Sequence, residues 1–256
     1  MNSSNGTELR EEQATSLWRR LVHLLKIYRP VAWLVFLIAS LVLFLVWMPT
    51  GMRSLIWIAL TSRGILSGML LVFSMLALSL LWSSGHQFDV WAFLFFNQGG
   101  YRPMWLDRFM LGFTQLGSGI FAFAIGLVLF AVGDRLGAYE LILGTLTLWI
   151  VVELIKALTQ RSRPSFHITQ ARIVGSLPIG RSFPSGHTSQ SFFIVTLIAQ
   201  HFELGPGVVI LLYAIALLVG ITRMYVGAHY PRDVLAGAIL GSAWGLLGAL
   251  VDEYIA

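Results

Sequence analysis

Long apolar runs without a charged residue constrain this chain more than any other feature. Val31–Met48 and Ile65–Trp82 are two such runs, and each is long enough to cross the hydrocarbon core of a bilayer as a helix. The composition agrees, because 57% of the 256 residues are hydrophobic and only 11% are charged. A soluble domain carries about a quarter charged residues. The sequence therefore predicts an integral membrane protein.

Further apolar segments continue the pattern, so we expect an all-α, polytopic membrane helix bundle. An aromatic-rich stretch, His86–Arg108, interrupts the runs and is predicted to form helices along the headgroup region. A long loop is expected from Thr159 to Gly186. The remaining predicted spans are Met110–Val132, Ala138–Leu158, Thr188–Phe202, Pro206–Ile221 and Val234–Val251.

The N-terminal region differs in character from the rest. Residues 1–13 are polar and predicted to be disordered. Residues 14–29 have the spacing of a basic amphipathic helix suited to a membrane surface, with a solvated helix start as the alternative. We expect a tail with this basic segment at 1–30, an additional span and linker at 31–63, and a helical core at 64–256. The chain has no cysteine, which excludes disulfides and thiolate metal sites.

Polar residues gather in three places rather than scattering through the spans. The first is KALTQRSRP, where Lys156 near the end of a predicted span is followed by Arg163 and Pro164. Pro164 is predicted to mark the point where the chain leaves helical geometry. An ionisable residue near membrane depth indicates function, although a lysine that snorkels from a helix end is the alternative.

The second place is RSFPSGHTSQ, which precedes another apolar run. The free backbone N–H groups at the start of the following helix attract anions, and Gly186 allows a ligand to approach the backbone. His187 is placed to donate a proton to such a ligand. Taken alone, Pro-Ser-Gly is also ordinary turn chemistry.

The third place is TRMYVGAHYPRDV, which contains Arg223, His229 and Asp233. A His and an Asp four residues apart near a helix start can meet on one face. A carboxylate that accepts the imidazole Nδ1–H leaves Nε2 free as a nucleophile. A structural His near an Asp is the alternative interpretation.

Simple up-and-down threading brings all three places to the same membrane face. Together they supply cations, a helix N-terminus, a His–Asp pair and a second His. These are the groups that phosphoryl transfer through a phosphohistidine requires. Asp233 is the only carboxylate in the three motifs, so the sequence favours a reaction without a metal ion or other cofactor.

These motifs resemble the signature of the type 2 phosphatidic acid phosphatase superfamily of membrane lipid phosphatases. That signature reads K-x6-R-P, P-S-G-H and S-R-x5-H-x3-D, and this chain departs from it only in Thr222, where Ser is usual. The general likeness extends over about residues 64–251. The matching stretches are Lys156-x6-Arg163-Pro164, Pro184-Ser185-Gly186-His187 and Thr222-Arg223-x5-His229-x3-Asp233.

The resemblance implies a six-helix phosphatase core preceded by one extra N-terminal span. It implies His229 as the nucleophile, Asp233 as its orienting acid and His187 as the general acid. It also implies a phosphate site formed by Lys156, Arg163, Arg223, Ser185 and Gly186. The expected partners are a lipid phosphate or pyrophosphate substrate and the bilayer, with no nucleic acid. The substrate and the oligomeric state stay open.

Two rival functions and the orientation in the membrane also stay open. Vanadium-dependent haloperoxidases share the motifs but are soluble, and a lipid transporter or scramblase could keep the phosphate pocket without the chemistry. The resemblance implies a cell-membrane protein whose active site faces outside, which is our expectation. With seven spans, however, the positive-inside rule places the site in the cytoplasm, because the N-terminal segment on the same face is the more basic one.

Overall fold

The computed structural model describes residues 64–255 and the isolated positions 43 and 47. Residues 64–255 lie within one compact unit, Trp57–Ala256, and the other unit is Met1–Ile56. The predicted tail and basic segment at 1–30 lie outside the described residues. So does the predicted extra span with its linker at 31–63, apart from positions 43 and 47.

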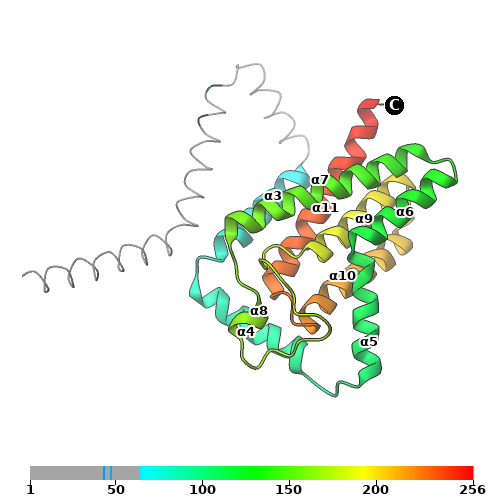
Figure 1. Cartoon of the computed structure of the whole chain (residues 1–256). Coiled ribbons are helices and arrows are strands. Elements are labelled where there is room, and N and C mark those ends of the chain that lie inside the picture. The colour runs from blue at the N-terminus through cyan, green and yellow to red at the C-terminus, as the bar shows by residue number, and fades with distance from the viewer. Residues whose placement is uncertain (1–42, 44–46, 48–63, 256) are drawn as a thin grey trace, which may run out of the picture. The chain divides into compact units, whose positions relative to one another are not determined.

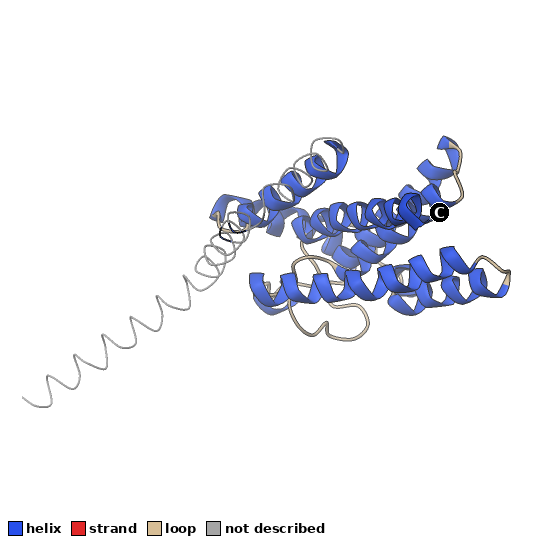
Figure 2. Cartoon of the chain, turned by 90° about the horizontal axis from the view of Figure 1, so that it is seen from above, coloured by secondary structure: helices blue, strands red, loops and turns tan. Residues whose placement is uncertain are grey.

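Within residues 64–255 every regular element is a helix, as expected for an all-α bundle (Figures 1 and 2). The elements in chain order are α3 (Gly64–Ser79), α4 (Ser83–Gln98), α5 (Met104–Phe113), η1 (Thr114–Gly117), α6 (Gly119–Ala131), α7 (Arg135–Thr159), α8 (Pro164–His167), α9 (Gly186–His201), α10 (Pro206–Tyr225) and α11 (Pro231–Ile255).

The outer surface of the bundle is apolar. The stretches Arg135–His167 and Pro206–Tyr225 are each long and apolar enough to cross a membrane. Large apolar side chains on these stretches face outward, including Trp149 at 62% exposure and Ile210 at 70%. Such exposure is stable only in lipid, so the chain is an integral membrane protein. The predicted number of spans stays a prediction.

The predicted span Met110–Val132 is wrong as a single helix. It is divided among the end of α5, the short 3₁₀ helix η1 and α6. The chain bends by 56° between Met104–Gly117 and Gly119–Ala131. The chain turns at Ser118, whose hydroxyl accepts the backbone N–H of Phe121 and caps α6. At the bend, a Cβ on Gly117 would lie 2.4 Å from the carbonyl oxygen of His187, so η1 packs directly against the start of α9.

The predicted exit from helical geometry at Pro164 is also corrected. Helix α7 already ends at Thr159, where Gln160 takes the left-handed conformation with φ of 52°. Pro164 instead begins the short helix α8, because its fixed φ and missing N–H suit the first helical position. The predicted loop Thr159–Gly186 therefore contains one helical turn.

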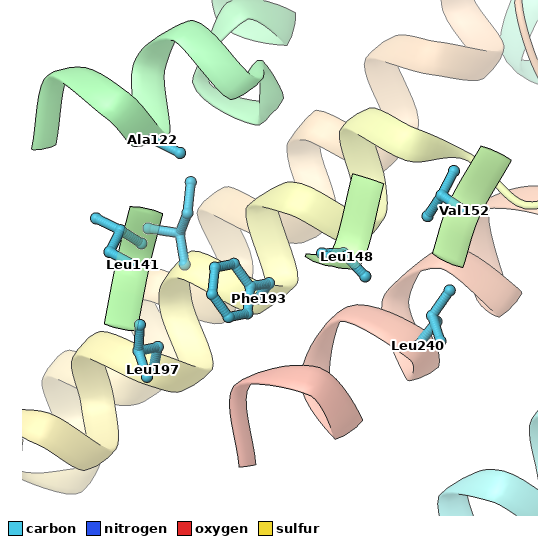
Figure 3. Packing of buried hydrophobic residues seen from close by; sticks show 8 residues of the cluster. Ala122, Leu141, Leu148, Val152, Phe193, Leu197 and Leu240 are labelled. Atoms are coloured by element: carbon cyan, nitrogen blue, oxygen red, sulfur yellow. The ribbon is translucent and has the colours of Figure 1, made fainter. Parts of the chain in front are cut away.

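The apolar core lies between α6, α7, α9 and α11, and Figure 3 shows Phe193 of α9 in the middle of it. Gly144 of α7 makes room for this ring, because a Cβ there would lie 2.3 Å from Phe193 Cζ. The buried residues of the cluster are Ala122, Leu141, Leu148, Val152, Phe193, Ile194, Leu197 and Leu240.

A row of glycines on α11 lets this helix pack backbone to backbone against α9 (Figure 1). A Cβ on Gly237 would lie 2.7 Å from the carbonyl oxygen of Ser185, and one on Gly241 would lie 2.1 Å from that of Ser189. Gly245 continues the row against Thr196. Small residues at this spacing allow close helix approach in membranes. The contact fixes the start of α9 next to the start of α11, which is where the motifs converge.

Candidate active site

The start of α9 forms one wall of the site. Ser185 is fully buried at the N-cap position, and its backbone N–H donates to the carbonyl oxygen of Asp233 at 2.9 Å. The first N–H groups of α9 have no partner within the helix and are available to an anion. The ammonium of Lys156 lies beside them, since a Cβ on Gly186 would be 3.8 Å from Lys156 Nζ.

His229 occupies the loop between α10 and α11 and is only 2% exposed. Its Nδ1 lies 2.7 Å from the carbonyl oxygen of Ser182, and its Nε2 lies 3.1 Å from Nη1 of Arg163. A carbonyl oxygen can only accept, so Nδ1 carries the proton and Nε2 keeps its lone pair. The nitrogen predicted to be the nucleophile therefore lies beside Arg163, one of the predicted phosphate-binding cations.

His229 and Asp233 lie next to each other, as their spacing predicts, but the carboxylate is not the group nearest to Nδ1. The two side chains approach to 3.7 Å between Nδ1 and Oδ2, longer than a hydrogen bond. The Asp233 carboxylate is fully buried and is bound by other groups instead. Its Oδ2 accepts the Ser182 hydroxyl at 2.5 Å and the Tyr230 backbone N–H at 2.8 Å, while Oδ1 pairs with Arg161 at 2.5 Å. Asp233 thus reaches His229 through Ser182.

The electrostatics keep the imidazole of His229 neutral. Burial is the main cause that lowers its pKa to about 3, and the nearby cation of Arg163 adds to this effect. Asp233 opposes the shift but does not cancel it. A neutral imidazole has the free lone pair that a nucleophile needs.

The predicted phosphate-binding cations come from three different segments. Arg163 is buried, and its Nη1 donates to the carbonyl oxygen of Ala228 at 3.1 Å. Arg223 donates from Nη1 to Thr114 Oγ1 at 2.9 Å, and its Nε is buried without a partner within residues 64–255. Lys156 is paired with Glu153 at 2.7 Å.

A cavity of about 200 Å³ opens beside His187 and Arg223. His187, the predicted general acid, is one of the residues that line it. Its polar lining is Thr114, Gln115, Ser176, His187 and Arg223, and its apolar lining is Leu111, Val174, Pro178, Val226 and Ala228. In the described part of the chain, no group of three or more His, Asp or Glu side chains could hold a metal ion.

The arrangement agrees with comparisons to known proteins. A sequence model of the PAP2 superfamily matches residues 137–255. Phosphatidylglycerophosphatase B of Bacillus subtilis is 31% identical over 169 residues, which cover 60% of this chain and 79% of that protein. The chain belongs to the PAP2 superfamily. The resemblance predicted from the three motifs is thus confirmed.

Two further relatives of this PAP2 chain are similar over different lengths. The lipid A 1-phosphatase of Rhizobium johnstonii is 34% identical over 107 residues, which span 40% of this chain and only 42% of that relative. The chain also superposes on the crystal structure of the first transmembrane PAP2 type phosphatidylglycerolphosphate phosphatase, from Bacillus subtilis, with a TM-score of 0.65 at 27% identity. The superposition covers 75% of this chain and 97% of the Bacillus subtilis chain. This likeness confirms the all-α membrane fold.

The PAP2 motif residues named from the sequence converge on one site, as the threading predicted. Three residues around them were not predicted from the sequence: the buried Ser182 and Asp89, and Arg161, which pairs with Asp89 and has a side chain that is 11% exposed. Asp233 is the only carboxylate in the three motifs, but the fold places two carboxylates from outside them beside motif residues: Glu153 pairs with Lys156, and Asp89 pairs with Arg161. An available signal was Asp89 itself, the one acidic residue within the apolar, aromatic stretch FDVWAFLFF.

Proposed function

We propose that this PAP2 chain is a lipid phosphatase that removes the terminal phosphate from a lipid phosphate or pyrophosphate through a phosphohistidine on His229. The observation that carries the proposal is the position of His229, whose Nδ1 faces the carbonyl oxygen of Ser182 while its Nε2 lies 3.1 Å from Arg163 Nη1. The relatives support the same chemistry, because their names describe phosphatases of phosphatidylglycerophosphate and lipid A.

In the first step, Nε2 of His229 attacks phosphorus while the bond from phosphorus to the lipid oxygen breaks. His187, protonated when the phosphate dianion lies beside it, gives its proton to that oxygen. Lys156, Arg163 and Arg223 hold the equatorial oxygens together with the first N–H groups of α9. The Ser182 carbonyl stabilises the positive charge that develops on the imidazole.

In the second step, water attacks the phosphohistidine and His187 takes a proton from that water. The nitrogen–phosphorus bond breaks, inorganic phosphate leaves, and His229 returns to its neutral form. The charge stabilisation comes from side-chain cations, so we propose that the reaction needs no metal ion. The class of lipid is set by the cavity beside His187 rather than by the reacting groups.

The test is release of inorganic phosphate by the full-length protein in detergent with EDTA present. The substrates are phosphatidate, phosphatidylglycerol phosphate, a polyprenyl pyrophosphate and lipid A. We expect release from at least one of them, inhibition by vanadate, and no release by His229→Gln. His187→Ala should lose about 10²–10⁴-fold on a lipid substrate but far less on p-nitrophenyl phosphate, whose leaving group needs no proton.

Absence of phosphate release from every substrate, with retained binding of vanadate, would favour the transporter or scramblase interpretation instead. Activity that is lost in EDTA and restored by magnesium would contradict the metal-independent step.

We also propose the domain division and the orientation expected from the sequence. Residues 64–256 would be the phosphatase core, preceded by an extra span and linker at 31–63 and a basic tail at 1–30. The active site would face outside the cell. Because the chain lacks native cysteine, single cysteines can report on this. Ser176 lines the cavity, whereas Gly205 lies beyond the other end of α9 with open space around it.

With an impermeant maleimide on intact cells, Ser176→Cys should react and Gly205→Cys should react only after the membrane is broken. The reverse pattern would place the active site in the cytoplasm.

A further inference from the structure

Two fully buried carboxylates, those of Asp89 and Asp233, are joined by one guanidinium. Arg161 contacts Asp233 Oδ1 through Nη1 at 2.5 Å and Asp89 Oδ2 through Nη2. The exposed fraction is 0% for both carboxylate side chains and 11% for Arg161. Asp233 belongs to the third motif, whereas Asp89 lies on α4, far from the motifs in sequence. A buried carboxylate is costly unless it is paired, so each charge here depends on the others.

The guanidinium of Arg161 is held in one orientation. Its two terminal nitrogens point to different carboxylates, and its Cζ lies 4.3 Å from the ring centre of Tyr230. A planar guanidinium forms such a fork, whereas an ammonium cannot. The position of Arg161 therefore sets the rotation of the Asp233 carboxylate.

The far side of Asp89 is anchored as well. Arg232 donates to it from Nε at 2.7 Å and from its backbone N–H at 3.2 Å. Nη1 of Arg232 in turn donates to the carbonyl oxygen of Ser79 at 2.6 Å, at the end of α3. Gly85 of α4 gives the guanidinium room, because a Cβ there would lie 2.6 Å from Arg232 Nη1. Asp89 is thus fixed to α3, α4 and α11.

Ser182 connects Asp233 to His229, the proposed nucleophile. Oδ2 of Asp233 accepts the hydroxyl of Ser182, and the carbonyl of the same Ser182 accepts Nδ1–H of His229. A rotation of the carboxylate would move Ser182 and with it the imidazole. A misplacement of about 1 Å at a reacting atom can cost on the order of 10²-fold in rate.

We infer that Asp89 and Arg161 are positioning residues for the nucleophile, acting through Asp233 and Ser182 on His229. Neither belongs to the phosphate-binding set, so they govern the rate of the chemical step and not the affinity for phosphate. This inference rests on the proposed phosphatase function.

The test compares Asp89→Asn with wild type in the full-length protein in detergent. We expect kcat to fall about 10- to 100-fold. KM and the inhibition constant of vanadate should stay within about 3-fold, since the cations that bind phosphate are untouched. A matched control is Asp107→Asn, which breaks another Arg–Asp pair, with Arg172 of the same long loop, without contact to Asp233. Its kcat should stay within about 3-fold of wild type.

A double-mutant cycle separates positioning from general loss of structure. In the Asp233→Asn background, Asp89→Asn should lower kcat by less than about 3-fold. The Asp233 carboxylate, through which Asp89 acts on His229, is already absent in that background. An equal loss in both backgrounds would overturn the inference, and so would a loss of vanadate affinity that parallels the loss of kcat.

Arg161→Lys provides a second variant if Asp89→Asn fails to fold. It keeps a cation between the carboxylates but removes the fork, so kcat should again fall at unchanged KM. Wild-type activity in this variant would also overturn the inference. An inactive wild type would instead count against the proposed function, so the two failures are distinguishable.

Discussion

Nδ1 of His229 lies 2.7 Å from the carbonyl oxygen of Ser182 but 3.7 Å from the nearest carboxylate oxygen of Asp233. The tautomer of His229, the proposed nucleophile, is therefore selected by a backbone group, and a side-chain substitution at Ser182 leaves that group in the chain. Asp233 contributes by holding Ser182 in place through its hydroxyl.

Asp233→Asn should consequently slow the reaction without abolishing it. In a triad where the carboxylate itself accepts Nδ1–H, this change costs about 10⁴-fold because the tautomer is wrong. Here the Ser182 carbonyl remains, so we expect a loss of about 10- to 100-fold in kcat. Phosphate release by Asp233→Asn and His229→Gln, measured side by side, decides the matter. Equal inactivity of both variants would show that the carboxylate acts directly.

The buried, neutral His229 should make stability depend on pH. Its pKa is about 3 in the folded protein against an ordinary value of 6.5, so between these values the unfolded chain binds more protons. Stability is therefore lost as the pH falls below 6.5, by up to about 1.4 kcal/mol per pH unit from this one residue. The midpoint of thermal unfolding, followed by tryptophan fluorescence, should fall more steeply from pH 7 to pH 5 in wild type than in His229→Gln. Parallel curves would contradict the prediction.

Glu153 should compete with the substrate for Lys156. The two side chains are paired at 2.7 Å, and that of Glu153 is 49% exposed. A bound phosphate has to share or replace this carboxylate, so Glu153→Gln should lower the inhibition constant of inorganic phosphate about 2- to 5-fold at low salt. The difference should shrink at high salt. Glu203→Gln, at the far end of α9, removes the same charge away from the site and should leave the constant unchanged.

The glycine row on α11 should tolerate no methyl group where it meets α9. A Cβ at Gly241 would lie 2.1 Å from the carbonyl oxygen of Ser189, so Gly241→Ala forces the helices apart. We expect a loss of about 1–3 kcal/mol in stability. Gly68→Ala on α3 is the control, because no heavy atom lies within 4 Å of its new Cβ and alanine favours a helix. The midpoint of thermal unfolding in detergent is measured for both variants and for wild type. An unchanged midpoint in Gly241→Ala would show that the two helices can move apart without loss of stability.

The motif residues could be found from the sequence because they lie at helix ends. Lys156, His187 and Asp233 each sit within a few residues of a long apolar run, so counting the runs was enough to bring them to one face. The break of the predicted span at Ser118 did not follow from hydropathy, because Thr114, Gln115 and Ser118 are uncharged and lie within one long run. The packing of Gly117 against His187 shows why the chain turns there.

The supporting residues could not be found in this way, because their contacts are tertiary. Asp89 and Arg161 are 72 residues apart in the sequence. Hydrophobic periodicity predicts each helix separately, so it does not show that α4 packs against the loop after α7. The role of Ser182 depends on its backbone carbonyl, which residue type does not reveal.

Part of the cavity wall beside His187 is irregular chain: Gln115 lies in the short helix η1, and Ser176 lies in the loop between α8 and α9. Neither residue belongs to α9 or α11, whose contact holds the start of α9 beside Asp233. We therefore expect replacement of Gln115 or Ser176 to change what fits beside a bound phosphate while the contact between α9 and α11 stays intact. On the proposed function, lipid preference can then diverge through single substitutions in this wall without any change to the buried residues around His229 and Asp233.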